Sequence, residues 1–316
     1  MGSKWKLNEL ATCCRNSLVS TTSDKLTNIP FIVITGTVRD PVALIIAGVH
    51  GDEFEGPAAI QDLMLEIEPT EVQGSIIFVP VANPSAFASA TRRHPLDNGD
   101  VNRSFPGSLN GGPTQQLAHD IFHEFALNAS SILSLHGWSK EASVVPYAEY
   151  SEDNSPAARA SQEVARRLGF QYLHPYRWPS GVLGDAVLAH GIPIVEVEVG
   201  GMGTITAQGQ ALCRDVILRF LAHFGIIEFD AASTPEPVLV SHYDLLSSSA
   251  GLFRSLVEVG DHVEAGHTIG TVHGLNGSLL ETVRASEAGT VAILRRLASV
   301  QPNDLLLQIF MNRQIA

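Results

Sequence analysis

The sequence predicts an α/β protein in which a mostly parallel sheet is flanked by helices and followed by a small, barrel-like C-terminal β domain. Two observations support this prediction. Short apolar segments alternate with helical segments up to Phe229 of the 316 residues, and such alternation is typical of a parallel sheet covered on both faces. After Phe229, a linker with two prolines is followed by short segments punctuated by glycine. We therefore expect two domains, residues 1–229 and 230–316.

The expected strands of the first domain are continuous apolar runs, which indicate strands buried on both faces. They are expected near residues 30–36, 42–48, 75–82, 131–136 and 192–199. Helices are expected near residues 54–66, 114–127, 155–169 and 206–225. The last helix has apolar residues at steps of four, a stripe that indicates packing in the core (Leu212, Val216, Phe220 and Phe224).

The C-terminal segment resembles the hairpins of biotinyl and lipoyl carrier domains, notably at residues 251–253 and 259–270. A carrier needs a lysine on an exposed turn, and all four lysines precede this segment (Lys4, Lys6, Lys25 and Lys140). The carrier function is therefore excluded. We expect the domain to be structural, either walling the active site or forming a contact in a homo-oligomer.

Composition narrows the class of partner. The net charge of −13 argues against nucleic acid, whose phosphates would repel the chain. No apolar run approaches the roughly 20 residues of a membrane span, and Lys4 and Lys6 are followed by a mixed segment rather than the apolar core of a secretory signal. The three cysteines form no disulfide framework. The sequence thus predicts a cytoplasmic enzyme with a small-molecule substrate.

The most informative segment is Gly-Val-His-Gly-Asp-Glu at residues 48–53. It follows an apolar strand and precedes a helix, so His50 and Glu53 are expected at a strand end, where loops carry function. Imidazole and carboxylate are both zinc ligands, and a catalytic zinc site uses three protein ligands. The alternative is a strand-end histidine beside an acidic helix N-terminus, with no metal.

A third ligand is expected at the end of another strand. His136 is the best match, because it ends the apolar run 131–136 and is followed by glycine, and ligands gather at the carboxyl ends of strands in open α/β sheets. A competing pair, His119 and His123, lies four residues apart on a predicted helix. It has Asp120 where a zincin motif has glutamate, so a polar helix face is the preferred interpretation.

The general base is expected on the strand near 192–199. Glu196 and Glu198 lie two residues apart and so share one side of that strand. Glu198 is nearer the glycines Gly200, Gly201 and Gly203, which would let the backbone approach a pocket closely. The alternative is an edge strand with solvated acids.

Substrate recognition is expected in the loop 91–107, which carries Arg92, Arg93, Asn102 and Arg103. A guanidinium can hold a carboxylate through two hydrogen bonds, and another can stabilise an oxyanion. The alternative is a solvated loop whose arginines pair with the acidic body.

Four segments together resemble the succinylglutamate desuccinylase and aspartoacylase family of the zinc carboxypeptidase clan: residues 48–53, 100–107, 135–137 and 198–203. The resemblance covers nearly all of the chain and implies a zinc-carboxypeptidase-like fold. It implies one Zn²⁺ per chain held by His50, Glu53 and His136. It also implies that Glu198 is the general base, that Arg92 polarises the scissile carbonyl, and that Asn102 and Arg103 hold a substrate carboxylate.

Among the branches of that family, the pattern Thr-Arg-x-x-Pro-x-Asp at residues 91–97 is most similar to the N-acetyl-diaminobutyrate deacetylase group. One departure concerns the metal. The family usually has aspartate two residues before the third ligand, and this chain has Ser134, which would support the metal less strongly.

The resemblance implies a zinc-dependent amidohydrolase that cleaves the acyl amide of a small N-acyl amino acid or N-acyl diamino acid. In this mechanism Glu198 takes a proton from water and later returns it to the leaving amine. Two alternatives stay open: a carboxypeptidase acting on peptides, and a non-catalytic binding protein that kept the pocket and lost the metal.

Overall fold

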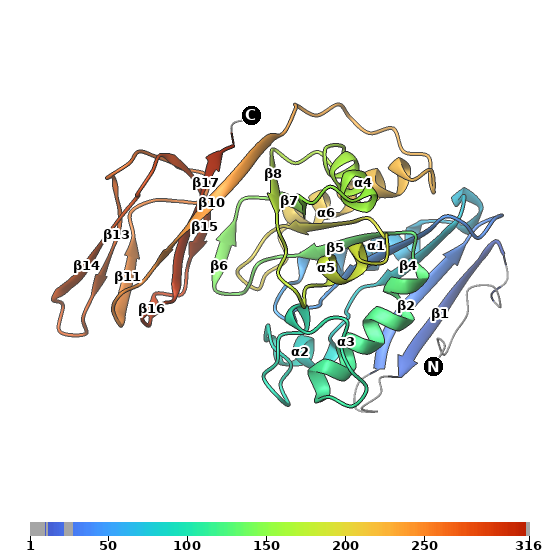
Figure 1. Ribbon diagram of the computed structural model, residues 1–316, viewed down its shortest axis with the longest axis horizontal. Coiled ribbons are helices and arrows are strands. Elements are labelled where there is room, and N and C mark those ends of the chain that lie inside the picture. Colours follow the sequence, from blue (N-terminus) through green and yellow to red (C-terminus); the bar gives the residue numbers. More distant parts are fainter. Residues whose placement is uncertain (1–9, 11, 22–27, 314–316) are drawn as a thin grey trace.

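The computed structural model describes residues 10, 12–21 and 28–313 (Figure 1). Its centre is a block of four adjacent parallel strands, in the order β4 (Ser75–Val79), β3 (Val42–Ala47), β5 (Ser131–His136) and β9 (Ile194–Glu198). Every residue of β3, β4 and β5 is buried, as expected for strands covered on both faces. These predicted strands are therefore confirmed.

The sheet as a whole is mixed, so the prediction of a mostly parallel sheet holds only for this centre. On one side, β2 (Asn28–Thr35) runs antiparallel to β4, and β1 (Cys14–Thr21) runs antiparallel to β2. On the other side, β7 (Tyr147–Ser151) runs antiparallel to β9 and parallel to β8 (Tyr172–Tyr176). The reversal at β7 arises because segment 137–146 contains no helix, and parallel strands need a longer crossover connection.

Helices cover both faces of this sheet. On one face α1 (Glu55–Glu66) and α6 (Ala207–His223) share an apolar core with the strands. On the other face α3 (Pro113–Glu124) and α5 (Leu183–Leu188) share a second core. The four predicted helices are confirmed, the fourth being α4 (Pro156–Ala165), which contributes to both cores.

Two helices were not predicted, α5 and α2 (Pro84–Ser89). Each has only six residues, too few to display a helical period. None of the helices in the described part of the chain is long and apolar enough to cross a membrane.

The last part of the chain, residues 238–312, consists of strands and turns. The large sheet continues into it through β10 (Val238–Leu246), which pairs with β8 and then with β17 (Leu305–Asn312). β15 (Gly289–Arg295) follows, flanked by β12 (His262–Val263) and by β6 (Ala142–Val144). A separate four-stranded sheet has the order β14 (Leu279–Arg284), β13 (Thr268–His273), β11 (Gly251–Ser255) and β16 (Ser299–Val300).

These C-terminal strands have an apolar core of their own, and a smaller core joins them to the rest (Ala142, Val144, Tyr147, Val240, Ile293 and Phe310 among others). They lie beside the α/β part rather than on top of it (Figure 1). The predicted β character is present. The large sheet is continuous across the predicted boundary at residue 230, because β8 before it pairs with β10 after it. The division into two domains therefore stays a prediction.

Candidate functional site

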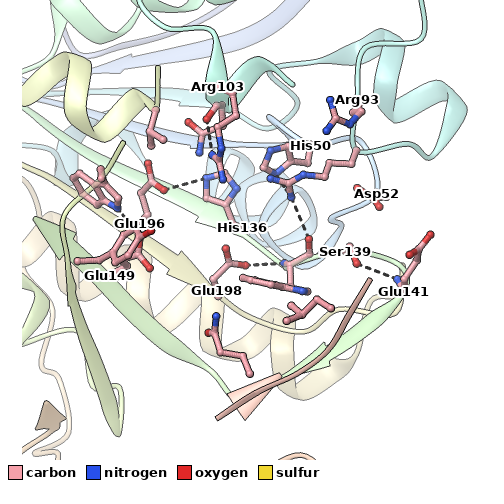
Figure 2. Close-up of a pocket in the computed structure, with 18 of the residues that line it drawn as sticks. His50, Asp52, Arg93, Arg103, His136, Ser139, Glu141, Glu149, Glu196 and Glu198 are labelled. Atoms are coloured by element: carbon pink, nitrogen blue, oxygen red, sulfur yellow. Dashed lines mark hydrogen bonds and ion pairs between the residues drawn. The ribbon is translucent and has the colours of Figure 1, made fainter. Parts of the chain in front are cut away.

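A pocket of about 710 Å³ opens where the carboxyl ends of β3, β5 and β9 meet (Figure 2). This edge is where ligands bind in open α/β sheets. The pocket is lined by residues from the strand ends, from loop 91–103 and from β7, β8, β10 and β17. The candidate residues expected from the sequence lie in or next to it.

His50, Glu53 and His136 come together at the bottom of this pocket. Their potential ligand atoms lie within 4.8 Å of one another, and all three residues are buried. Glu53 stands between the rings: Oε1 is 2.9 Å from His50 Nδ1, and Oε2 is 3.1 Å from His136 Nδ1. Burial alone would raise the pKa of the Glu53 carboxyl. The two histidines outweigh that effect and hold this pKa well below its ordinary value.

The far nitrogen of each imidazole also has a partner. His50 Nε2 is 3.2 Å from Asp100 Oδ1, and His136 Nε2 is 3.0 Å from Ser134 Oγ. Partners of this kind set the tautomer, because a ring that donates from Nε2 presents the lone pair of Nδ1. Ser134 thus occupies the supporting place in which the sequence comparison expected an aspartate, with a hydroxyl in place of a carboxylate.

The residues present fit a divalent metal ion. Two imidazole Nδ1 atoms and one carboxylate converge from a strand end, a helix start and a second strand end, and this is a donor set that Zn²⁺ accepts. Within the described ranges, this is the one group of three or more His, Cys, Asp or Glu side chains close enough to hold an ion. The competing pair, His119 and His123, lies on α3 with ring centroids 4.2 Å apart and is not part of the pocket.

Arg92 is fixed beside this group. Its Nε donates to Asp100 Oδ2 at 3.1 Å, and its Nη1 lies 3.6 Å from Glu53 Oε1 and 3.4 Å from the Trp138 carbonyl. Burial would lower the pKa of this guanidinium, but the carboxylates of Asp100 and Glu53 raise it. Arg92 therefore presents a permanent positive charge next to the metal-ligand candidates.

Glu198 lies at the end of β9, opposite His136 in the strand register. The strand is central, between β5 and β7, so the alternative of an edge strand is wrong. The Trp138 backbone N–H donates to Glu198 Oε2 at 2.6 Å. Burial, together with the nearby negative charge of Glu53, raises the pKa of Glu198 to about 8. A carboxyl with such a pKa can exchange a proton near neutral pH.

The glycines after Glu198 do bring the backbone close to a neighbour. Gly200, Gly201 and Gly203 have positive φ angles, and a Cβ on Gly200 would lie 2.2 Å from the carboxyl group of Glu55. Glu55 is buried behind the loop and does not line the pocket. Burial raises the pKa of Glu55 to about 7. The close approach therefore encloses a buried carboxyl rather than narrowing the pocket.

Asn102 and Arg103 both line the pocket. Asn102 is buried, and its Oδ1 accepts a hydrogen bond from the Leu183 backbone N–H at 2.9 Å. This bond leaves the Nδ2 group as the donor available to a ligand. Arg103 is exposed, and its Nη1 donates to the Asn102 carbonyl at 2.7 Å. Arg93 also lines the pocket, so this loop supplies three guanidinium groups.

Sequence reasoning missed three residues on the side of the pocket where Glu196 lies. Glu149 on β7, His174 on β8 and His242 on β10 line it and are connected: Glu149 Oε2 is 2.9 Å from His174 Nδ1, and His174 Nε2 is 2.9 Å from His242 Nδ1. Asp100 belongs to the family motif at residues 100–107, but sequence analysis assigned no role to it. The available signal was the period of two, which places Glu149 and Tyr147 on one face of β7. Trp178 also lines the pocket and donates from Nε1 to Glu149 Oε1.

Comparison with known proteins supports these observations. Residues 39–224 match the family described as the succinylglutamate desuccinylase/aspartoacylase catalytic domain. The chain is 32% identical over 277 residues to an N-alpha-acetyl-L-2,4-diaminobutyric acid deacetylase from Halomonas elongata, covering 84% of this chain and 81% of that protein.

Solved structures agree over nearly the whole length. The product-bound ectoine utilization protein EutE (DoeB) from Ruegeria pomeroyi superposes with a TM-score of 0.85 at 26% identity and covers 93% of each chain. A succinylglutamate desuccinylase/aspartoacylase from Rhodobacter sphaeroides superposes with a TM-score of 0.87 at 26% identity, covering 95% of this chain and 96% of that one.

Proposed function

The chain belongs to the succinylglutamate desuccinylase/aspartoacylase family, and on this premise we propose that it is a zinc-dependent amidohydrolase. It removes the acyl group from a small N-acyl amino acid or N-acyl diamino acid. The observation that carries the proposal is the buried donor set of His50, Glu53 and His136, with Glu198 and Arg92 in the same pocket.

His50, Glu53 and His136 would hold the ion, because their possible ligand atoms lie within 4.8 Å of one another in one buried group. When bound, zinc supplies Lewis acidity, which polarises a carbonyl and makes water a better nucleophile at neutral pH. Asp100 and Ser134 orient the two imidazoles from behind.

Glu198 is the proposed general base and acid. Its Oε2 accepts the Trp138 N–H, which orients the carboxyl and leaves Oε1 to take a proton from water and return it to the leaving amine. Arg92, held by Asp100, stabilises the negative charge that develops on the acyl oxygen. Asn102 Nδ2 and the Arg103 guanidinium bind the substrate carboxylate.

The substrate class follows from the size and charge of the pocket and from the relatives. A pocket of about 710 Å³ suits a small molecule, and its three arginines suit a carboxylate. The relative from Halomonas elongata is named for the deacetylation of N-alpha-acetyl-2,4-diaminobutyrate. A cytoplasmic location and a homo-oligomeric state stay predictions.

The test is amine release from N-acetyl, N-succinyl and N-formyl amino acids and diamino acids, measured with and without chelator and after zinc is added back. We expect turnover that the chelator abolishes and zinc restores. Cleavage of C-terminal peptides in place of these amides would favour the carboxypeptidase alternative. A purified protein without metal that binds these compounds and turns none over would favour the binding-protein alternative.

A further inference from the structure

A row of polar side chains crosses four strands beside the metal-ligand candidates. In the strand register, Ser134 on β5 lies opposite Glu196 on β9, Glu196 opposite Glu149 on β7, and Glu149 opposite His174 on β8. Side chains directly opposite on neighbouring strands share a face and lie about 5 Å apart. The row therefore places two carboxylates, Glu196 and Glu149, side by side on one side of the pocket (Figure 2).

These two carboxylates differ in their hydrogen bonds. Glu149 has a donor at each oxygen: Trp178 Nε1 donates to Oε1, and His174 Nδ1 lies 2.9 Å from Oε2. Glu196 is 8% exposed, and its Oε1 has no hydrogen-bond partner among the described residues. The Glu196 Oε2 atom lies 4.0 Å from His136 Nε2, which is too far for a hydrogen bond. That nitrogen instead has the Ser134 hydroxyl as its partner, at 3.0 Å.

A buried carboxylate oxygen without a donor is unfavourable, and a second carboxylate beside it adds repulsion. A ligand with a cationic donor would remove both costs. The same pocket also holds positive charge, because Arg92, Arg93 and Arg103 line it from a single loop. A ligand that pairs with both kinds of charge carries a carboxylate and an ammonium group.

Resting on the proposed amidohydrolase function, we propose that Glu196 binds the free side-chain ammonium of an N-acyl diamino acid and so sets the enzyme's preference for a cationic substrate. In this arrangement Arg103 holds the carboxylate, and Glu196 Oε1 accepts a hydrogen bond from the ammonium group. Glu149, oriented by Trp178 and His174, adds a second carboxylate on the same side of the pocket.

Asp52 provides a matched control. It also lines the pocket and is buried, and its Oδ1 lacks a hydrogen-bond partner among the described residues. It lies near Arg93 and away from Glu196 and Glu149 (Figure 2), and its Oδ2 accepts a hydrogen bond from the Lys140 backbone N–H at 3.2 Å. An Asp52→Asn variant therefore removes a comparable buried carboxylate without changing the side of the pocket assigned to the ammonium.

The test compares kcat/KM for N-alpha-acetyl-L-2,4-diaminobutyrate with kcat/KM for N-acetyl-L-2-aminobutyrate, which lacks only the amine. For the wild type we expect a preference for the cationic substrate. Glu196→Gln should lose roughly 10- to 100-fold on that substrate, the strength of a charge-assisted hydrogen bond, with little change on the neutral one and an unchanged metal content. Asp52→Asn should keep the wild-type preference.

A positioning role for Glu196 behind His136 gives a different result. Ser134→Ala removes the direct support of His136 without changing the charge of the pocket, so it should slow both substrates by the same factor. If Glu196→Gln behaves like Ser134→Ala and loses metal, or if the wild type does not discriminate between the two substrates, the proposal is overturned. Should Glu196→Gln not fold, Glu196→Asp keeps the charge on a shorter arm and should retain only part of the preference.

A binding measurement separates this proposal from the proposed function. Calorimetric titration with free 2,4-diaminobutyrate and with 2-aminobutyrate needs no turnover. Tighter binding of the diamine to the wild type than to Glu196→Gln would support the ammonium site even in a protein that hydrolyses neither amide. Equal binding of both compounds to both proteins would reject it.

Discussion

The metal-ligand group and the acidic side of the pocket balance their buried charges differently. On the side of β3 and β5, Glu53 is contacted by both histidines, and Asp100 by His50 and Arg92. On the side of β7 and β9, Glu196 keeps an oxygen without a hydrogen-bond partner among the described residues. The contrast teaches that the metal-ligand group is organised before any ligand binds, whereas the acidic side gains its missing donor from a ligand.

The largest expected effect on activity comes from disrupting the metal-ligand group. His136→Ala removes one of three metal-ligand candidates, so we expect loss of bound zinc and a fall in kcat/KM of about 1,000-fold or more, because the ion's Lewis acidity is lost. Metal analysis of the purified variant and amine release check this. Full activity with one zinc per chain would remove His136 from the site.

The Glu198→Gln substitution should have the next largest effect on activity. It keeps the shape and the Trp138 contact but cannot accept a proton, so kcat should fall by roughly 100- to 10,000-fold. Zinc content should equal that of the wild type, which distinguishes this variant from His136→Ala. Activity near the wild-type level with zinc bound would show that the general base has been assigned wrongly.

The pH dependence sharpens the same contrast. A general base works only when ionised, so kcat/KM should rise with pH, about tenfold per pH unit on the acidic limb. Burial and the charge of Glu53 raise the pKa of Glu198 to about 8 without an ion, and a bound cation lowers it. We therefore expect kcat/KM to stop rising and level off at a pH below 8. A limb that persists unchanged in Glu198→Gln would belong to another group.

The Ser134→Ala substitution tests how much metal binding depends on the partner of His136. The Ser134 hydroxyl lies 3.0 Å from His136 Nε2, and loss of such a partner lowers metal affinity by about tenfold or somewhat more. Competition with a chelator of known affinity measures this change. Ser134→Asp should raise the affinity, because a carboxylate increases the basicity of the ring; an affinity indifferent to both changes would show that Ser134 is not a support.

The smallest effect on activity is expected at Glu55, a buried carboxyl outside the pocket that also has an unpartnered oxygen among the described residues. Burial raises the pKa of Glu55 from 4.5 to about 7. The folded protein therefore holds a proton that the unfolded chain releases, and stability should decline as the pH rises from about 4.5 to 7.

Glu55→Gln should lack that decline and gain on the order of 1–3 kcal/mol over the wild type at pH 8, with unchanged substrate preference. Denaturant unfolding at pH 5 and pH 8 measures the difference, and Glu228→Gln, at an exposed carboxylate, is the control. A changed substrate preference would mean that an unpartnered carboxyl influences specificity even outside the pocket.

Much of the metal-ligand group could be predicted, because the sequence patterns that indicate it are local. His50 and Glu53 are three residues apart at one strand end. A continuous apolar run predicts the strand that ends at His136. The parallel centre of the sheet then brings the strand ends together. The reversal of β7 was not predicted, because its cause is the absence of a crossover helix in a segment with no apolar period.

The sequence by itself determined the metal-ligand candidates, the candidate base and the arginine loop, because strand ends, turns and residue chemistry are written in short segments. Only the tertiary structure decided that Glu196 would face Glu149, and Glu149 would face His174 and Trp178. Those neighbours come from separate strands and a loop. Their meeting depends on strand order and register, which are set by the packing of the whole sheet rather than by any local pattern.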